Sequence, residues 1–249
     1  MVSHSFTTKT GVFAKQHPSS ESARTEYERT ADVYRQVQQA QPRYLRVAKP
    51  LGIENNTVYF EHITGCVNLR TLICRWHVEL DVLYLVGQAL AELHLALNPD
   101  LKNLNQRLHI HGDFSAVNVL YHRRNRLIYL VDFARYHLDD SDSYCYGPAY
   151  RDLAHLVTTL EIKYPMYQLY LVARTQNKRM SRTFWAGYDA LIGGKIDYER
   201  LKDAVIADID VAISRARRRN ILSRLIWTSV ARRVRQQYLD WKAHGYEQE

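Results

Sequence analysis

The fold of this chain is decided by residues 109–132, which read HIHGDFSAVNVLYHRRNRLIYLVD. The HGD tripeptide forms a predicted turn that ends in Asp113, and Asn118 stands at the mouth of a short strand, VLY. A second strand, LIYLV, leads directly to Asp132. We therefore expect the two strands to deliver Asp113, Asn118 and Asp132 to one end.

These three polar residues are of the types that phosphoryl transfer from ATP requires. A carboxylate accepts the proton of the attacking hydroxyl, while an amide oxygen and a second carboxylate hold divalent metal on the phosphates. Asp113, Asn118 and Asp132 supply these groups in that order, and the four residues between the first two let both face one metal. The competing interpretation is a polar hairpin turn that contains Asp and Asn without a catalytic role.

The pattern HGD-x4-N followed by VDF resembles the catalytic and metal-binding loops of the protein-kinase-like fold, in the version used by aminoglycoside phosphotransferases and related small-molecule kinases. The resemblance implies an α+β, bilobal fold with a reduced N-terminal β-lobe and a mainly helical C-terminal lobe. It also implies ATP and Mg²⁺ as cofactors, Asp113 as the general base, and Asn118 and Asp132 as metal ligands. Protein kinases usually carry Arg where Gly112 stands.

The segment after Asp132 separates the branches of this fold. Protein kinases continue with Phe-Gly and a long activation segment that ends in Ala-Pro-Glu, whereas this chain has Ala134 in place of Gly and no Ala-Pro-Glu. Only about twenty residues lead to Asp152, as in small-molecule kinases, and Asp152 either caps the helix that begins there or braces the catalytic loop. An acidic cluster in between suits a cationic substrate or a solvated loop: Asp139, Asp140 and Asp142.

The N-terminal part of the chain supplies the predicted phosphate-binding residues. Residues 11–16, GVFAKQ, alternate as a strand does, and the resemblance makes Lys15 the lysine that contacts the nucleotide phosphates. A serine-capped helix is expected up to about Gln39, and the kinase fold places on it a glutamate that holds the lysine. Glu26 shares a face with apolar residues and Glu28 with polar ones, so Glu26 is the predicted partner. Alternatively, the lysine and the glutamate are solvated surface charges.

A hairpin between residues 51 and 63 is predicted to end at the connection between the lobes. In the family the end of its second strand becomes the hinge, whose backbone holds adenine, and this implies nucleotide contacts at Glu61 and Ile63. Residues 1–63 would then form a reduced, nucleotide-binding N-terminal lobe. Residues 64–249 would form the helical lobe with the catalytic and metal-binding loops.

Two features depart from the family pattern. Kinases cover the phosphates with a glycine-rich hairpin ahead of the lysine strand, but only eleven residues precede Val12, and they contain a single glycine, Gly11. The first strand and its glycine-rich turn are therefore predicted to be missing or much shortened. Phe13 stands where the family prefers a small residue against which adenine packs.

Helical periodicity dominates the rest of the chain. Residues 81–97 carry a continuous apolar stripe that ends before Asn98-Pro99. His94, near the end of this stripe, has no partner at metal-ligand spacing and is predicted to be a structural histidine. Later helices are interrupted at Gly193-Gly194, and the last one, residues 220–241, places apolar residues at helical spacing with arginines elsewhere.

Charge and composition limit the cellular setting. The net charge is +8, and the segment from residue 214 to the end carries nine Arg or Lys against three acids, so it holds +6 of the total. A basic amphipathic helix suits an anionic membrane surface, RNA or an acidic partner, or covers a core with a solvated cationic face. No apolar run approaches the length of a membrane span, the N-terminus lacks a hydrophobic signal core, and the three cysteines lack metal spacing. We therefore expect a cytoplasmic protein, peripheral at the inner membrane if the basic helix binds lipid.

These observations favour an ATP- and Mg²⁺-dependent kinase that phosphorylates a hydroxyl of a small molecule or glycan, such as a lipopolysaccharide-core sugar. The basic C-terminal region equally suits a small atypical protein kinase associated with RNA. The abbreviated N-terminus favours another alternative, a pseudokinase-type binding module that keeps the fold without the activity. The presence of Asp113, Asn118 and Asp132 opposes that alternative.

Overall fold

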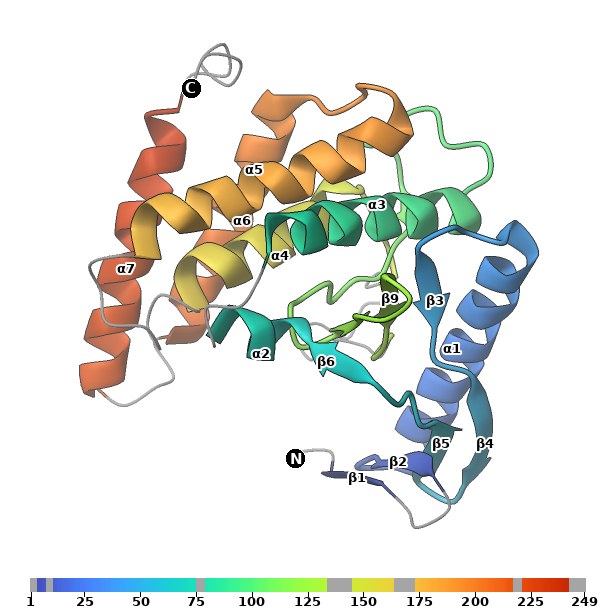
Figure 1. Ribbon diagram of the computed structural model, residues 1–249. Helices are drawn as coiled ribbons and strands as arrows, with labels where there is room; N and C mark the ends of the chain where they lie inside the picture. Colours follow the sequence, from blue (N-terminus) through green and yellow to red (C-terminus); the bar gives the residue numbers. More distant parts are fainter. Residues whose placement is uncertain are drawn as a thin grey trace.

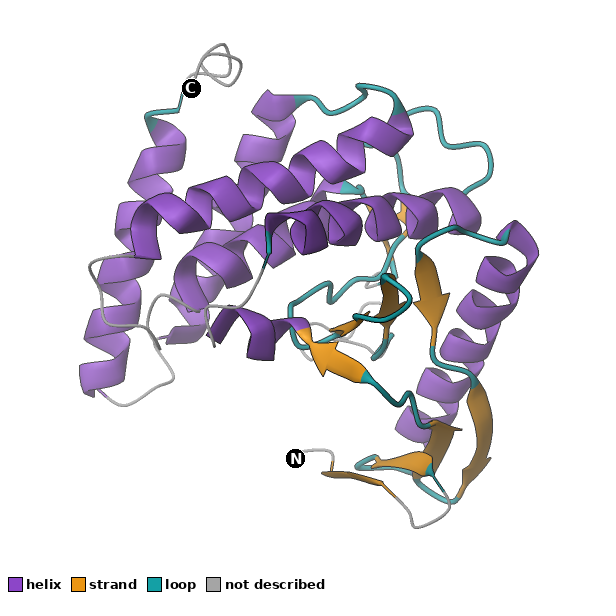
Figure 2. Ribbon diagram, in the orientation of Figure 1, coloured by secondary structure: helices purple, strands orange, loops and turns teal. Residues whose placement is uncertain are grey.

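The computed structural model describes residues 4–7, 11–74, 79–133, 145–163, 173–216 and 221–241. A small sheet with one long helix forms one end of the molecule, and a larger body of helices forms the other (Figures 1 and 2). The predicted α+β, bilobal arrangement with a mainly helical second lobe is thus confirmed. Ala134 and the acidic cluster of Asp139, Asp140 and Asp142 lie outside the described residues.

The N-terminal sheet is antiparallel, with the strand order β1-β2-β5-β4. The predicted lysine strand is present as β2 (Val12–Gln16), and the predicted hairpin as β4 (Pro50–Glu54) and β5 (Thr57–Glu61). A short first strand, β1 (His4–Thr7), pairs with β2. The first strand is therefore shortened rather than missing.

One long helix, α1 (Ser20–Ala40), packs against this sheet. Ser19 caps it as the serine-rich sequence predicted, because its hydroxyl oxygen accepts a hydrogen bond from the backbone N–H of Ser22 at 3.1 Å. The buried residues of α1 recur at helical spacing: Ala23, Glu26, Thr30, Val33 and Val37. Glu26 therefore points inward from the same face as the apolar residues.

A second sheet has the strand order β3-β9-β8-β6 and carries residues 110–118, the predicted catalytic loop. Its central hairpin is the predicted one, β8 (Val119–His122) paired antiparallel with β9 (Leu127–Leu130). The edges are β6 (Cys66–Asn68), antiparallel to β8, and β3 (Leu45–Val47), parallel to β9. The pairing of β3 was not predicted, and it joins a segment from the N-terminal part of the chain to the second lobe. A separate two-stranded sheet pairs β7 (Leu108–His109) with β10 (Tyr146–Gly147).

Helices make up the body of the second lobe (Figure 2). Two of them, α3 and α5, approach closely at Gly87 and Gly187, where a Cβ atom on either glycine would collide with the backbone of the other helix. In chain order the helices are α2 (Leu69–Cys74), α3 (Leu80–Leu97), α4 (Tyr150–Thr158), which continues into a π-helical turn (Thr159–Lys163), α5 (Ala173–Ile192), α6 (Tyr198–Ala216) and α7 (Ile221–Leu239).

The helix α3 is the centre of the large hydrophobic core. By length and by its mean hydropathy of 1.4 it would suit a membrane span, but 67% of it is buried inside the protein. Polar residues interrupt this helix at Asp81, Gln88, Glu92 and His94, so α3 has the length of a span without being an uninterrupted apolar run, and it is a core helix. The last helix, α7, buries Val230 and Tyr238 of the predicted apolar stripe, and it also buries Trp227 and Ala231, which the stripe did not include.

Candidate active site

The catalytic loop lies between β7 and β8 and brings Asp113 against Asn118. The Asn118 amide nitrogen donates to the backbone carbonyl of Asp113 at 2.9 Å and to its carboxylate Oδ2 at 3.1 Å. Asn118 is buried, whereas the Asp113 side chain keeps 18% of its surface exposed. With the amide nitrogen turned to Asp113, the amide oxygen of Asn118 is the group available to a ligand.

Asp152 braces this loop from the first turn of α4. Its carboxylate accepts hydrogen bonds from the backbone N–H groups of His111 (2.7 Å) and Gly112 (2.9 Å), and it lies 3.1 Å from the His94 ring. Burial alone would raise the pKa of Asp152, but the hydrogen bond and charge of His94 and the N–H donor of Gly112 outweigh burial and lower it. Of the two predicted roles, Asp152 takes the brace, because the N-cap position belongs to Ala149.

His94 is the structural histidine that the sequence predicted. Its ring is fully buried, with Nδ1 2.8 Å from the hydroxyl of Tyr188 and Nε2 3.1 Å from Asp152. Both ring nitrogens therefore have protein partners.

His111 connects the catalytic loop to the end of β9. Its Nε2 lies 3.1 Å from the carbonyl oxygen of Val131, and the backbone N–H of Asp113 donates to Nδ1 at 3.3 Å. A ring that accepts at Nδ1 and donates at Nε2 is neutral, and burial accordingly lowers the pKa of His111. The ring of Phe133 packs on it with a centroid distance of 4.6 Å. The position of Asp132, between Val131 and Phe133, is thus fixed from both sides.

Asp132 meets Lys15 across the lobes. Lys15 Nζ lies 2.8 Å from Asp132 Oδ1 and 2.9 Å from Glu26 Oε2, so one ammonium group bridges two carboxylates. Burial would lower the pKa of Lys15, but the charges and hydrogen bonds of Asp132 and Glu26 raise it, and the lysine remains charged. The structure places Glu26 rather than Glu28 against Lys15, since the Glu28 side chain is exposed and lies near Arg24.

The backbone of Asp132 is unusual, with φ at 61° in the left-handed region. Aspartate tolerates this region better than most residues, yet a single residue held there stores strain, and such residues cluster at functional sites. The contacts of Val131 and Phe133 with His111 hold this conformation.

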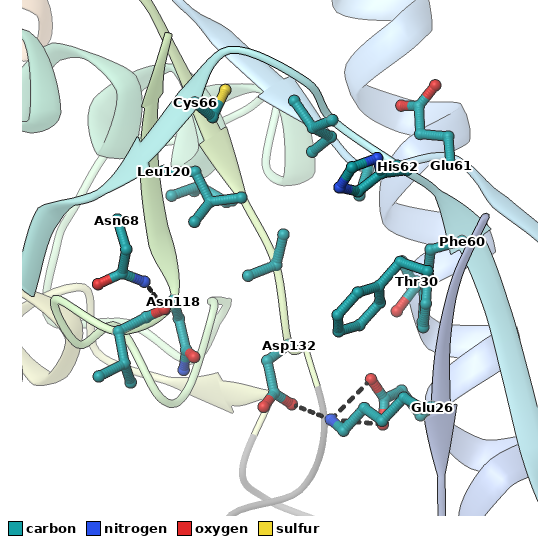
Figure 3. A pocket seen from close by; sticks show the side chains of 17 residues that line it. Glu26, Thr30, Phe60, Glu61, His62, Cys66, Asn68, Asn118, Leu120 and Asp132 are labelled. Carbon is teal, nitrogen blue, oxygen red and sulfur yellow. Dashed lines mark hydrogen bonds and ion pairs between the residues drawn. The ribbon is translucent and has the colours of Figure 1, made fainter. Parts of the chain in front are cut away.

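A cavity of about 520 Å³ lies between the lobes, within the usual size range of ligand pockets. Figure 3 shows Glu26, Asn118 and Asp132 in one part of it and Glu61 and His62 in another. The lining also includes mainly apolar side chains: Phe13, Ala48, Phe60, Ile63, Cys66, Leu120 and Leu130. The cavity therefore combines an apolar slot with a charged end.

The predicted hinge lines this cavity through Glu61, His62 and Ile63. The Glu61 backbone N–H donates to the carbonyl of Lys49 at 2.9 Å, and the Glu61 carboxylate accepts from the Lys49 N–H at 2.9 Å. Glu61 is thus engaged with the start of β4, and the segment after it faces the cavity. Phe13 also lines the cavity, on the β2 side.

Two contacts between the lobes were not predicted from the sequence. The Arg29 guanidinium, on α1, donates to the carbonyl oxygen of His111 in the catalytic loop at 2.9 Å. The Glu92 carboxylate, on α3, accepts from the backbone N–H groups of three consecutive residues at 2.7–3.2 Å: Arg43, Tyr44 and Leu45. Arg29 lies one turn after Glu26, so its spacing was a usable signal, whereas nothing near Glu92 in the sequence indicates its partners.

The residues present fit a magnesium ion. Mg²⁺ is usually held by one or two carboxylates together with the phosphates of the substrate, rather than by a full set of protein ligands. Asp132 and the amide oxygen of Asn118 offer this kind of set in the charged part of the cavity. Within the described ranges no cluster of three His, Cys, Asp or Glu side chains forms a self-sufficient metal site.

The sequence profile of the phosphotransferase enzyme family (APH) matches residues 67–201, more than half of the chain. This chain belongs to that family. It is a kinase that transfers phosphate to a hydroxyl acceptor, and the matched residues include Asp113, Asn118, Asp132 and Asp152. Lys15 and Glu26 lie outside the match. No curated protein matches the chain in sequence.

Solved structures share the fold of this phosphotransferase. A glucosamine kinase in complex with glucosamine, ADP and inorganic phosphate aligns with a TM-score of 0.69 at 12% identity, over 96% of this chain and 80% of that one. The gentamicin complex of APH(2")-IIa aligns with a TM-score of 0.52 at 14% identity, over 98% of this chain and 90% of that one. At these identities the similarity establishes the kinase-like architecture.

Proposed function

We propose that this phosphotransferase moves the γ-phosphoryl group of ATP, with Mg²⁺, to a hydroxyl of a small polyhydroxylated molecule or glycan. The observation that carries the proposal is the bridge of Lys15 between Glu26 and Asp132, at the charged end of a cavity that Asn118 also lines. A charged lysine held by two carboxylates beside oxygen ligands suits a polyphosphate with its metal.

In this proposal the nucleotide lies along the cavity. Residues 1–63 form the nucleotide-binding lobe, with the adenine in the apolar slot next to Glu61 and Ile63 and the phosphates at Lys15. Residues 64–249 carry the catalytic and metal-binding loops. Phe13 lines the slot where the family prefers a smaller residue, so the base would lie against an aromatic ring.

Asn118 and Asp132 would hold the metal in this proposal. When bound there, Mg²⁺ neutralises negative charge on the phosphates that flank the transferred group. The hydrogen bonds from Asn118 Nδ2 to Asp113 orient the amide. Because Asn118 and Asp132 line the same cavity, the amide oxygen and the Asp132 carboxylate would share one metal ion.

Asp113 would act on the acceptor. Its carboxylate lies beside Asn118, is partly exposed, and is positioned to accept the proton of the attacking hydroxyl. Two backbone N–H groups of the loop donate to Asp152, and the Arg29 side chain donates to a backbone carbonyl of the loop. These bonds would hold the Asp113 carboxylate beside the phosphate end of the cavity.

The proposed acceptor class is supported by the ligands of the similar structures, glucosamine and gentamicin, both of which carry hydroxyl and amino groups. A lipopolysaccharide-core sugar is a narrower version of the same class, and it would add a contact between α7 and an anionic surface. Arg232 and Arg233 are exposed on α7, whereas Arg235 pairs with Asp210 at 2.8 Å. Co-sedimentation with anionic vesicles, compared with tRNA binding across a salt series, distinguishes lipid from RNA.

A combined assay tests the proposal. Purified protein is incubated with ATP, Mg²⁺ and a panel of sugars, amino sugars and aminoglycosides, and products are detected by a mass increase of one phosphoryl group. Thermal shift with ATP, with and without Mg²⁺, measures nucleotide binding independently. We expect metal-dependent stabilisation by ATP and a phosphorylated acceptor. Failure of ATP to stabilise the protein under any metal would contradict the proposed donor and favour a binding module.

A further inference from the structure

The ring of His155 lies between two carboxylates next to the catalytic loop. Its Nε2 is 3.2 Å from Asp113 Oδ1, and its Nδ1 is 3.1 Å from Asp208 Oδ1. The ring is mostly buried, with 12% of the side chain exposed. Neither His155 nor Asp208 belongs to the loop motif, and both lie far from Asp113 in the sequence.

The helix α4 presents His155 and Asp152 to the same loop. The two residues are three apart, so they share one face of the helix. Asp152 holds the loop through two backbone N–H groups, whereas His155 approaches the side chain of Asp113. Asp208 comes from α6, which packs along α4, and approaches the ring from its other side.

We propose that His155 is a positioning residue that fixes the carboxylate of Asp113 toward the acceptor hydroxyl, and that Asp208 fixes the ring of His155. The inference rests on the proposed function, in which Asp113 accepts the proton of the hydroxyl. Asn118 already holds Oδ2 of the same carboxylate at 3.1 Å, so His155 on Oδ1 fixes the carboxylate from its second oxygen. Removing one of two such restraints lets the carboxylate rotate away from the hydroxyl.

The chemistry of the ring supports charge as the basis of this contact. A neutral imidazole has only one N–H group. Its other nitrogen carries a lone pair, which would repel the lone pairs of a facing carboxylate oxygen. Facing carboxylates at both nitrogens therefore favours the doubly protonated ring, which carries a positive charge between Asp113 and Asp208. The approach to Asp113 is an ion-pair contact rather than an aligned hydrogen bond, and such contacts at active sites commonly tighten when substrate binds.

A set of variants separates positioning from packing. His155→Gln keeps an N–H donor near the place of Nε2, His155→Leu removes it, and Asp208→Asn removes the charge behind the ring. The matched control is Thr158→Val, an isosteric change at another buried position of α4. We expect His155→Leu to lower kcat by roughly 10–100-fold, with little change in KM for ATP, because misplacing a reacting group costs about this much. His155→Gln should recover most of that loss, Asp208→Asn should lie between, and Thr158→Val should match the wild type.

Two outcomes would contradict the positioning role of His155. If His155→Leu and His155→Gln lose kcat equally, and in proportion to a lowered Tm, then His155 only packs between α4 and α6. If His155→Leu keeps the full kcat while Asp113→Asn has none, the proposed function stands and this inference is wrong.

A measurement without turnover keeps the two proposals distinguishable. Long-range ¹H–¹⁵N spectra of protein with ¹⁵N-labelled histidine report the protonation of each ring nitrogen, and His155→Gln identifies the signals of His155. We expect a doubly protonated ring at pH 7 whose nitrogen shifts change in Asp113→Asn and in Asp208→Asn. A neutral ring, insensitive to both substitutions, would overturn the inference even if no acceptor were phosphorylated.

Discussion

The catalytic loop and the N-terminal lobe are held in place in different ways. The loop is buried in the large core, and its polar groups find partners within a compact neighbourhood, as with Asp152 on the loop N–H groups and His111 on Val131. The N-terminal lobe has a much smaller core of its own, in which Phe13 and Tyr27 pack against the buried residues Ala23, Val58 and Phe60.

Because its own core is small, the N-terminal lobe is also held by contacts with the C-terminal lobe. Lys15 reaches Asp132, and Arg29 reaches the carbonyl of His111. Glu92 accepts hydrogen bonds from three backbone N–H groups of the connection between α1 and β3. We infer that the loop is the fixed reference of the site. The N-terminal lobe is aligned to it by these charged side chains together with apolar residues of α1 and β3 that belong to the large core: Val33, Val37, Leu45 and Val47.

The largest expected effect lies in the loop itself. Asp113→Asn keeps the shape of the side chain but removes the carboxylate that we propose accepts the hydroxyl proton, so we expect phosphoryl transfer to fall by roughly 100–10,000-fold. Circular dichroism and Tm should stay close to the wild type, because Asp113 is not part of the hydrophobic core. Initial rates with the best acceptor measure the effect, and a fully active variant would remove Asp113 from the mechanism.

A smaller effect is expected in the N-terminal lobe. Glu26→Gln removes one of the two carboxylates on Lys15 and should lower kcat/KM for ATP by about 10–100-fold, because the lysine loses its alignment with the phosphates. Glu28→Gln, two residues away on the exposed face, is the matched control and should be nearly unchanged. Equal activity of the two variants would show that the alignment of Lys15 does not depend on Glu26.

The Glu92 clamp, the set of hydrogen bonds that the Glu92 carboxylate accepts from the backbone of Arg43, Tyr44 and Leu45, should contribute to the free energy of unfolding. Glu92→Gln weakens charge-assisted hydrogen bonds to backbone N–H groups, and we expect it to lower the free energy of unfolding by about 1.5–3 kcal/mol in urea titrations. The control is Asp81→Asn, on the same helix as Glu92. It removes an exposed ion pair with Arg126 and should lower the free energy of unfolding by at most about 1 kcal/mol. If Asp81→Asn were the more destabilising change, the clamp would not be what joins the lobes.

The smallest expected effect is the pH dependence of the loop. Burial lowers the pKa of His111 in the folded protein, so the unfolded chain takes up a proton below pH 6.5 that the folded protein does not. The stability contributed by the neutral ring is therefore present above pH 6.5 and is lost as the pH falls below it, by up to about 1.4 kcal/mol per pH unit. His111→Gln, which retains a donor for Val131, should have a flatter dependence of Tm on pH between 7.5 and 5.5. Parallel curves would contradict a neutral, buried His111.

The part of the site that the sequence predicted is the part built from local patterns. The turn, Asn118 and the two strands lie within one short stretch, and helical periodicity alone chose Glu26 over Glu28. The family resemblance placed Lys15 on its strand, which the structure shows as β2. The loop residues are close together in sequence and Glu26 follows a helical period, so one sequence is enough to recognise them, whereas Lys15 needed the family resemblance.

The contacts that the sequence did not predict join segments that are distant along the chain. The strand β3 has three residues, too few for an alternating pattern, and it forms only because β9 pairs with it. Glu92 finds backbone partners more than forty residues away, and His155 lies between Asp113 and Asp208. Such contacts depend on how helices and sheets pack, which no local pattern of residue types encodes.

A crystal structure with Mg²⁺ and a non-hydrolysable ATP analogue tests most directly whether ATP and its metal occupy the cavity between the catalytic loop and the N-terminal lobe. We predict adenine near Glu61 and Ile63, phosphate oxygens at Lys15, metal between Asn118 and Asp132, and the terminal phosphate facing Asp113. A nucleotide bound elsewhere, or metal without contact to Asn118 and Asp132, would contradict it.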